Sequence, residues 1–218
     1  MTRTLLLDLD GTLVDSVPDL AAALNRLMAA RGLGEFDHRA VTAMVGDGAA
    51  ALLARAFAAR GTVPDETALE DFLADYTANA AVETRPFPGV EAGLQALAAS
   101  GWRLAVCTNK PEAAARALLA ALGLEASFAA IGGGDSFPVR KPDPAHLTAT
   151  LDAAGGTPSR ALMAGDHHND VAAAAGAGMP CIFAAWGYGP AAMGAGAVAV
   201  ATSFEELVGM AEALLPSP

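Results

Sequence analysis

Hydrophobic residues are arranged in two different ways along the chain. Residues 5–7 are three leucines that stand just before a group of polar side chains, a pattern that indicates a buried strand. Residues 18–81 instead hold Ala- and Leu-rich stretches, each with an acidic residue near its start, where the helix dipole favours negative charge. We predict helices at residues 20–30, 49–59 and 67–80, and no strand in this block.

From residue 86 onwards, apolar stretches of strand length alternate with stretches of helical length. Strands are predicted at residues 103–107, 128–131, 161–164 and 181–184, with a short apolar run at 197–201. Helices are predicted at residues 90–99, 112–122, 144–154, 169–175 and 204–215. Such alternation favours a parallel sheet with helices on both faces. The predicted fold class is therefore α/β, a Rossmann-like parallel sheet core with an all-helical cap inserted after the first strand.

The helical block interrupts the α/β pattern directly after its first strand. We predict an α/β core formed by residues 1–15 and 86–218, and a helical cap formed by residues 16–85. Two linkers, near residues 15–18 and 84–88, join these parts. Because there are two linkers, a hinge motion of the cap is expected.

Composition excludes some classes of partner. The chain has 218 residues, 53% of them hydrophobic, and its 13 basic and 24 acidic residues give a net charge of −11. A chain without a basic surface is not expected to bind nucleic acid or an acidic membrane in a general way. We therefore expect small molecules as partners. No feature of the sequence indicates an oligomeric state.

The sequence also predicts a cellular location. The first strand carries two aspartates and so differs from the core of a signal peptide, and no later segment has the roughly 18 unbroken apolar residues that span a membrane. We therefore expect a cytoplasmic protein. Cys107 and Cys181 stand within predicted strands, so both are expected to be buried, reduced thiols.

Polar residues follow the predicted core strands. Asp8 and Asp10 stand two apart, so their side chains point to the same face of a strand, and Gly11 then permits a sharp turn. Three further groups follow the later strands: Thr108 with Asn109, Lys141, and Asp166 with Asp170. The carboxyl ends of parallel strands meet at one edge of a sheet, where ligands bind in open α/β folds. We therefore expect these side chains to converge there.

The motifs occur in a recognisable order. Asp-x-Asp-Gly-Thr-Leu-Val-Asp-Ser is followed by Thr-Asn, then by Lys-Pro-Asp-Pro, and finally by Gly-Asp-x-x-x-Asp. This series spans the whole chain and resembles the haloacid dehalogenase superfamily of phosphatases, and the position of the helical block resembles its helical-cap type. Residues 45–48, 138–142 and 186–189 also resemble segments of the phosphoglycolate phosphatases.

The resemblance implies a phosphomonoester hydrolase that works through an aspartyl-phosphate and converts 2-phosphoglycolate, a small phosphorylated metabolite, to glycolate and phosphate. It assigns Asp8 as the nucleophile and Asp10 as general acid and then base, roles that suit two neighbouring carboxyl groups. It assigns binding of the phosphoryl group to Thr108, Asn109 and Lys141. Donors of this kind act by positioning and by stabilising charge.

A metal ion is expected at the aspartates. Bringing Asp8, Asp10 and Asp166 within about 4 Å of one another would cost roughly 4 kcal/mol per pair at an effective dielectric constant near 20. Oxygen ligands and a phosphate substrate favour Mg²⁺. By the resemblance, Asp8 and Asp166 give side-chain oxygens and Asp10 gives its backbone carbonyl. Asp170 would support the site from beyond these ligands or through water.

Two features of the sequence leave alternatives open. His167 and His168 stand where the superfamily commonly has a serine, and at most one of them could reach the metal, because neighbouring side chains point in different directions. The other interpretation is that one of these histidines is packed or hydrogen-bonded and the other is solvated. In the cap, the backbone N–H groups of residues 46–48, or a cation such as Arg39 or Arg55, could hold a small carboxylate.

Other functions share the same motifs. A phosphomutase of the β-phosphoglucomutase type would release an isomerised sugar phosphate instead of inorganic phosphate, and a phosphatase for another small phosphate ester would differ only in substrate. A phosphate-binding regulatory module is disfavoured, because binding alone needs no acid beside the nucleophile. A dehalogenase is disfavoured because those superfamily members lack the second aspartate, which is present here as Asp10.

Overall fold

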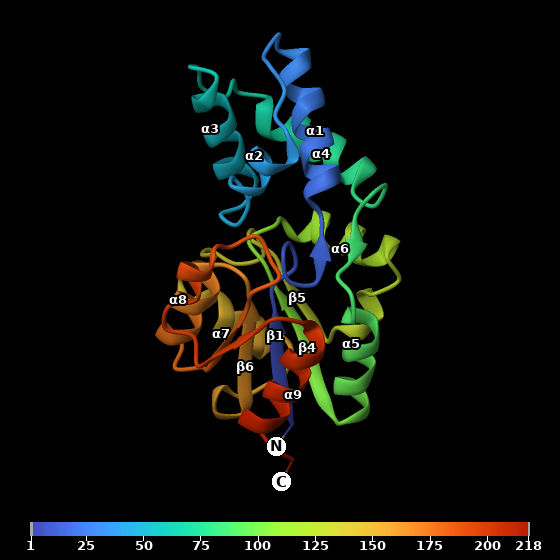
Figure 1. The fold of residues 1–218 in the computed structure, drawn as a ribbon, viewed down its shortest axis with the longest axis vertical. Helices are drawn as coiled ribbons and strands as arrows, with labels where there is room; N and C mark the ends of the chain where they lie inside the picture. The colour runs from blue at the N-terminus through green and yellow to red at the C-terminus, as the bar shows by residue number, and fades with distance from the viewer. Residues whose placement is uncertain (1, 218) are drawn as a thin grey trace.

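Within residues 2–217, which the computed structural model describes, a six-stranded parallel sheet forms the centre of the molecule (Figure 1). Its spatial order is β5-β4-β1-β6-β7-β8, and every neighbouring pair is parallel. The strands are β1 (Arg3–Leu7), β4 (Trp102–Cys107), β5 (Ala130–Gly132), β6 (Ala161–Gly165), β7 (Cys181–Ala184) and β8 (Ala199–Ala201). The chain builds the sheet outwards from β1 to one edge and then resumes on the other side of β1. This doubly wound order places ligand sites at the carboxyl ends of the central strands.

Helices cover both faces of the sheet. Leu5 and Leu7 of β1 belong to one buried apolar cluster, and Leu6 belongs to the other, as the alternation of side chains along a strand requires. The Leu5 face packs against α5 (Val90–Ala99), α6 (Glu112–Ala121) and α9 (Phe204–Leu214), and the Leu6 face packs against α7 (Pro144–Ala153) and α8 (His168–Gly176). Short 3₁₀ helices at Glu125–Ser127, Pro158–Arg160 and Ala191–Gly194 precede β5, β6 and β8. The predicted α/β fold class is confirmed.

Four helices lie together at the end of the sheet where its strands terminate (Figure 1). They are α1 (Val17–Ala30), α2 (His38–Thr42), α3 (Ala49–Ala59) and α4 (Ala68–Asn79). Their inner faces join the same apolar cluster as the Leu5 face of the sheet, through side chains such as Leu24, Leu53 and Phe72. Because the apolar contact is continuous, burial of these side chains stabilises the helical group against the sheet.

The two chain segments that lead into and out of the helical group pair with each other. Strand β2 (Val14–Asp15) is antiparallel to β3 (Arg85–Pro86), with Val14 opposite Pro86. The buried carboxylate of Asp19 in α1 accepts hydrogen bonds from the backbone N–H and the hydroxyl of Thr84, at 2.8 and 2.7 Å. Both segments are therefore held together at the position where the sequence places the linkers.

Some element bounds differ from those predicted. Helix α1 begins at Val17 and not at residue 20, because Pro18 is compatible with the first turn of a helix, where its missing N–H leaves no hydrogen bond unmade. Strand β5 begins at Ala130 and not at residue 128, because the preceding 3₁₀ helix ends at Ser127. Helix α2 and strands β2 and β3 were not predicted, since two to five residues are too few to show a periodic pattern.

The contact between α5 and α9 generates a prediction about stability. A Cβ atom added at Gly93 of α5 would lie 2.6 Å from Cε1 of the buried Phe204. We expect Gly93→Ala to lower the free energy of unfolding by about 1–3 kcal/mol through overpacking, although alanine is the better helix former. Chemical denaturation of the purified protein measures this.

The matched control is Gly209→Ala in α9, where a new Cβ meets no atom within 4 Å. There, helix propensity acts alone, so a gain of up to about 1 kcal/mol is expected. If both variants are equally stable, then Phe204 does not pack as closely on α5 as described.

Candidate active site

Three buried carboxylates lie together at the carboxyl edge of the sheet. Asp8 directly follows β1, Asp166 directly follows β6, and Asp170 lies in the first turn of α8. One oxygen from each lies within 4.8 Å of the others, and all three residues are buried. The predicted convergence of Asp8, Asp166 and Asp170 is therefore present in the structure. Asp10, which was also expected in this group, directs its carboxylate elsewhere.

The ammonium of Lys141 neutralises part of this charge. Its Nζ lies 3.0 Å from Asp8 Oδ1 and 2.6 Å from Asp170 Oδ1, and the side chain is almost fully buried. Burial opposes the charge of Lys141, but the attraction of Asp170 and Asp8 outweighs it and raises the pKa of Lys141. Lys141 is therefore paired with Asp8 as well as Asp170 and is held in its charged form.

His146 fixes the loop that carries Lys141. The backbone N–H of Lys141 donates to His146 Nδ1 at 3.1 Å, so the proton of the neutral ring is on Nε2, which lies 3.0 Å from the Gly133 carbonyl oxygen. Burial, aided by the charge of Lys141, lowers the pKa of His146 to about 4. Sequence reasoning missed this residue. It lies five residues after Lys141, in the first turn of α7, and this spacing indicates a role only once the loop conformation is known.

Backbone and hydroxyl donors hold Asp166. Its Oδ1 accepts from Thr12 Oγ1 at 3.0 Å, and its Oδ2 accepts from the N–H groups of Tyr188 and Gly189 at 2.7 and 3.2 Å. Gly11 lies so close that an added Cβ would be 2.8 Å from the Asp166 carboxyl carbon. Burial and the nearby Asp8 raise the pKa of Asp166 to about 6. The motif around residues 186–189 therefore has a structural role in orienting this carboxylate.

Asp10 forms a separate ion pair. Its Oδ1 accepts from the Ser16 hydroxyl at 2.5 Å, and both of its carboxylate oxygens lie 3.0 Å from Nζ of Lys110. Burial opposes the charge of Lys110, but attraction to Asp10 raises its pKa. Lys110 was not predicted as a site residue, although it directly follows the Thr-Asn motif. A buried ammonium here keeps Asp10 apart from the three clustered carboxylates.

Thr108 and Asn109 have different environments. Thr108 directly follows β4, and its Oγ1 accepts from the N–H of Lys110 at 3.2 Å, so its own proton is available to a ligand. The side-chain nitrogen of Asn109 already donates to the carbonyls of Gly46 and Lys141, at 3.1 and 3.0 Å. Its side chain therefore joins the helical group to the core, and the predicted role in phosphate binding remains open to its backbone N–H.

The two adjacent histidines lie outside the carboxylate cluster. His167 precedes α8. Its ring Nδ1 accepts from the backbone N–H of Asn169, and its backbone N–H donates to Asp170 Oδ2, an arrangement that caps the helix. Burial and the neighbouring His168 lower the pKa of His167. Both imidazoles lie near Asp47 of the helical group. This geometry matches the interpretation of packed and exposed histidines.

The candidate cap residues are partly engaged by the protein itself. Arg55 forms an ion pair with Asp47 and donates to the Met44 carbonyl at 2.8 Å. Asp47 also accepts from the side chain of Asn169 at 2.7 Å. Arg39 lies with Arg55 along an open cleft of about 660 Å³ that reaches Asp10 and Asp166. A carboxylate-binding role for either arginine remains a prediction.

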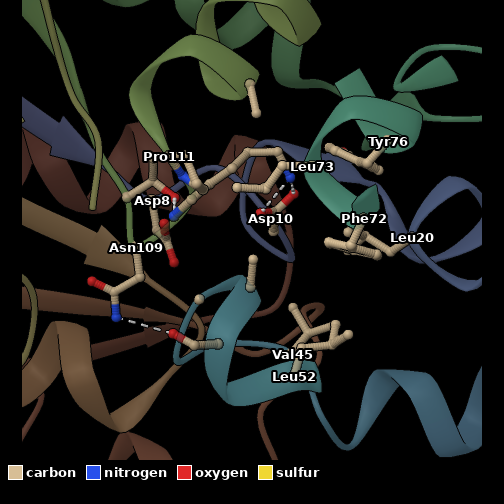
Figure 2. Close-up of a pocket in the computed structure, with 16 residues that line it drawn as sticks. Asp8, Asp10, Leu20, Val45, Leu52, Phe72, Leu73, Tyr76, Asn109 and Pro111 are labelled. Atoms are coloured by element: carbon tan, nitrogen blue, oxygen red, sulfur yellow. Dashed lines mark hydrogen bonds and ion pairs between the residues drawn. The ribbon is translucent and has the colours of Figure 1, made fainter. Parts of the chain in front are cut away.

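A small cavity separates the core carboxylates from the helical group (Figure 2). The space in it that the centre of a water molecule can occupy is about 40 Å³. The core side contributes polar residues, among them Asp8, Asp10 and Thr108, while α3 and α4 contribute mainly apolar side chains. The core carboxylates thus face a restricted space with an apolar roof, a shape that suits a small ligand.

Comparison with known proteins agrees with this geometry. The chain is an α/β protein with carboxylates at the ends of its parallel strands, and residues 2–178 match the haloacid dehalogenase-like hydrolases. The chain belongs to the haloacid dehalogenase-like hydrolase family. It is 46% identical over 216 residues to a phosphoglycolate phosphatase of Rhodospirillum rubrum, covering 95% of this chain and 90% of that protein.

Two further matches agree with this family assignment. The chain is 45% identical over 185 residues to a phosphoglycolate phosphatase of Agrobacterium fabrum, covering 83% of this chain and 79% of that protein. The crystal structure of a predicted phosphoglycolate phosphatase from Haemophilus somnus superposes with a TM-score of 0.88 at 31% identity, covering 96% of this chain and 97% of that one. The predicted resemblance is confirmed. Among the described residues, no helix has both the length and the apolar character to span a membrane.

The raised pKa of Asp166 predicts an effect of pH on stability. In the unfolded chain Asp166 has the ordinary carboxyl pKa of 3.8, and in the folded chain its pKa is about 6. Between these two pH values, Asp166 is therefore protonated mainly in the folded state. The stabilisation of the folded state by this proton is complete below pH 3.8 and is lost as the pH rises through 6. In metal-free protein it amounts to about 2–3 kcal/mol.

Urea denaturation at pH 4.5 and pH 7.5, with a chelator present to remove metal ions, tests this pH dependence. Asp166→Asn is the comparison because it lacks the titrating group. We expect the stability of the wild type, relative to the variant, to fall with rising pH. Parallel pH profiles for the two proteins would contradict the assignment.

Proposed function

We propose that this chain is a Mg²⁺-dependent phosphomonoester hydrolase that cleaves 2-phosphoglycolate to glycolate and phosphate through an aspartyl-phosphate. One observation carries the proposal: two aspartates that are two residues apart are held in different surroundings. Asp8 lies beside Lys141 among buried carboxylates, while Asp10 lies apart, paired with Lys110. A nucleophile and an acid–base group need such separate environments. The names of the relatives support 2-phosphoglycolate as the substrate.

The residues present fit a divalent cation. Asp8, Asp166 and Asp170 bring three buried carboxylates together, and Lys141 supplies one positive charge to them. The remaining negative charge, with donors that are all oxygen atoms, matches the preference of Mg²⁺. We assign the side chains of Asp8 and Asp166 and the carbonyl of Asp10 as the groups that hold it, with Asp170 supporting them through Lys141. Bound Mg²⁺ would neutralise charge on the phosphoryl group and polarise its P–O bonds.

In the first step, a carboxylate oxygen of Asp8 attacks phosphorus and the bond from phosphorus to the ester oxygen breaks. Asp10 gives a proton to that oxygen, so the alcohol leaves neutral. In the second step, Asp10 takes a proton from water, whose oxygen attacks phosphorus and releases Asp8 and inorganic phosphate. The Ser16 hydroxyl and the Lys110 ammonium orient the Asp10 carboxyl group for both transfers.

The other predicted residues position the phosphoryl group. The free proton of the Thr108 hydroxyl and the ammonium of Lys141 donate to its oxygens, and the Asn109 N–H does so from the adjoining backbone. Such donors are most effective where water is excluded. We propose that residues 16–85 act as a cap on the core formed by residues 1–15 and 86–218, covering the cavity during the reaction. The contact between Asn109 and Gly46 supports this closed arrangement.

The proposal predicts that Asp8→Asn and Asp10→Asn each lower kcat by several orders of magnitude, because each removes one participant in bond making or proton transfer. Release of inorganic phosphate from 2-phosphoglycolate, measured with and without Mg²⁺, tests this. Rapid quenching should trap phosphorylated protein in the wild type and none in Asp8→Asn.

Asp152→Asn, at an exposed position in α7, is the matched control and should keep full activity. A wild-type protein that hydrolyses no phosphate ester in the presence of Mg²⁺ would overturn the proposal. Release of an isomerised sugar phosphate in place of inorganic phosphate would instead identify a mutase.

A further inference from the structure

The cavity beside the proposed acid contains a polar group that the protein leaves without a partner. Tyr76 of α4 is 1% exposed, lines the cavity, and has no hydrogen-bond partner for its hydroxyl among the described residues. A buried hydroxyl without a partner costs free energy, so its retention calls for an explanation. Burial raises the pKa of Tyr76 to about 12, and the group therefore remains a proton donor at neutral pH.

The ammonium of Lys110 lies beside this hydroxyl-bearing ring. Its Nζ is 4.3 Å from the centre of the Tyr76 ring and 3.0 Å from each carboxylate oxygen of Asp10. An ammonium has three N–H donors, and the two contacts that Lys110 makes with Asp10 use at most two of them. Lys110 thus has donor capacity that Asp10 does not use, and it lies within the same cavity as Tyr76.

The other cap residues around the cavity provide no competing charge. Val45, Leu52, Phe72 and Leu73 present apolar side chains to it, as Figure 2 shows. An ammonium and a hydroxyl surrounded by apolar side chains bind an anion strongly, because water screens them little. Since the cavity has only about 40 Å³, the anion must be small.

We propose that Tyr76 and Lys110 form a carboxylate subsite, which binds the end of the substrate opposite the phosphate. The inference rests on the proposed function, which places the ester oxygen of the substrate against Asp10. In 2-phosphoglycolate a single methylene separates that oxygen from the carboxylate, and Asp10 and Lys110 are likewise in direct contact. One short molecule can therefore reach both groups. Tyr76, supplied by the cap, completes the subsite only when the cap is closed.

The test compares 2-phosphoglycolate with ethyl phosphate, which has a methyl group in place of the carboxylate. The readout is the ratio of the two kcat/KM values at saturating Mg²⁺. Tyr76→Phe keeps the ring over Lys110 and removes only the hydroxyl, so we expect this ratio to fall by on the order of tenfold, while ethyl phosphate is hydrolysed at an unchanged rate.

Lys110→Met removes the charge and also leaves Asp10 without its partner, so both substrates should slow. The ratio should nevertheless fall further than in Tyr76→Phe, by about 30-fold or more, because a charged donor is lost. Leu73→Met changes the apolar wall without altering charge or hydroxyl groups, and it should keep the wild-type ratio. Unchanged ratios in both Tyr76→Phe and Lys110→Met, with hydrolysis intact, would overturn the subsite.

A binding measurement separates this inference from the proposed function. Calorimetric titration of 2-phosphoglycolate into Asp8→Asn protein with Mg²⁺ needs no turnover. Introducing Tyr76→Phe into this Asp8→Asn protein should weaken the binding of 2-phosphoglycolate on the order of tenfold, whereas the affinity for ethyl phosphate should not change. If the wild type shows no hydrolysis and yet this selective loss appears, the hydrolase proposal fails while the subsite stands. Equal weakening for both ligands would contradict the subsite.

Discussion

The burial of opposite charges at the carboxyl edge of the sheet is the constraint on which the rest of the site depends. Lys110 and Lys141 are the only lysines in the sequence, and both are buried at this edge. Lys141 pairs with Asp8 and Asp170, and Lys110 pairs with Asp10. A buried charge is tolerated only with a partner at close range. The two ammonium groups therefore fix where each carboxylate can lie, and they divide the aspartates into two groups with different chemistry.

This charge arrangement also couples the helical group of α1 to α4, the proposed cap, to the sheet. Lys110 lies just after β4 of the sheet, yet the face of Tyr76 that covers its ammonium comes from α4 of the helical group. Asn109 likewise follows β4 and donates to the Gly46 carbonyl, which lies just before α3 of the helical group. If the cap moved away, both polar contacts would be replaced by water, and the ammonium of Lys110 would become solvated. Cap position and the strength of electrostatic interactions at Asp10 are thus linked by solvent access.

The sequence predicted the elements that repeat over many residues and the motifs that end strands. Buried strands and Ala-rich helices have long periodic patterns, so the sheet, the helical block and the convergence of Asp8 with Asp166 could be foreseen. The pairing of Asp10 with Lys110 could not, because the direction of the Asp10 side chain, at the turn just before Gly11, depends on the tertiary partner that it meets. His146 was missed for the same reason, since its role depends on how the loop carrying Lys141 folds back onto α7.

Lysine suits this site because its ammonium is small and donates hydrogen bonds in several directions. Arginine provides the remaining basic residues of the chain, and several form paired contacts with surface carboxylates, as Arg26 does with Asp75. A guanidinium can also contact two carboxylates, as Arg31 does with Asp65 and Asp71, but all of its donors lie in one plane, whereas an ammonium is a compact charge with donors in three directions. Lys141 can therefore contact two carboxylates from different elements at once. In the same way, Lys110 can hold Asp10 and still offer a donor to the cavity. A protein with a net charge of −11 can accommodate an anionic substrate, because those two compact cations lie at the proposed substrate site, and the screened surface charges lie farther away.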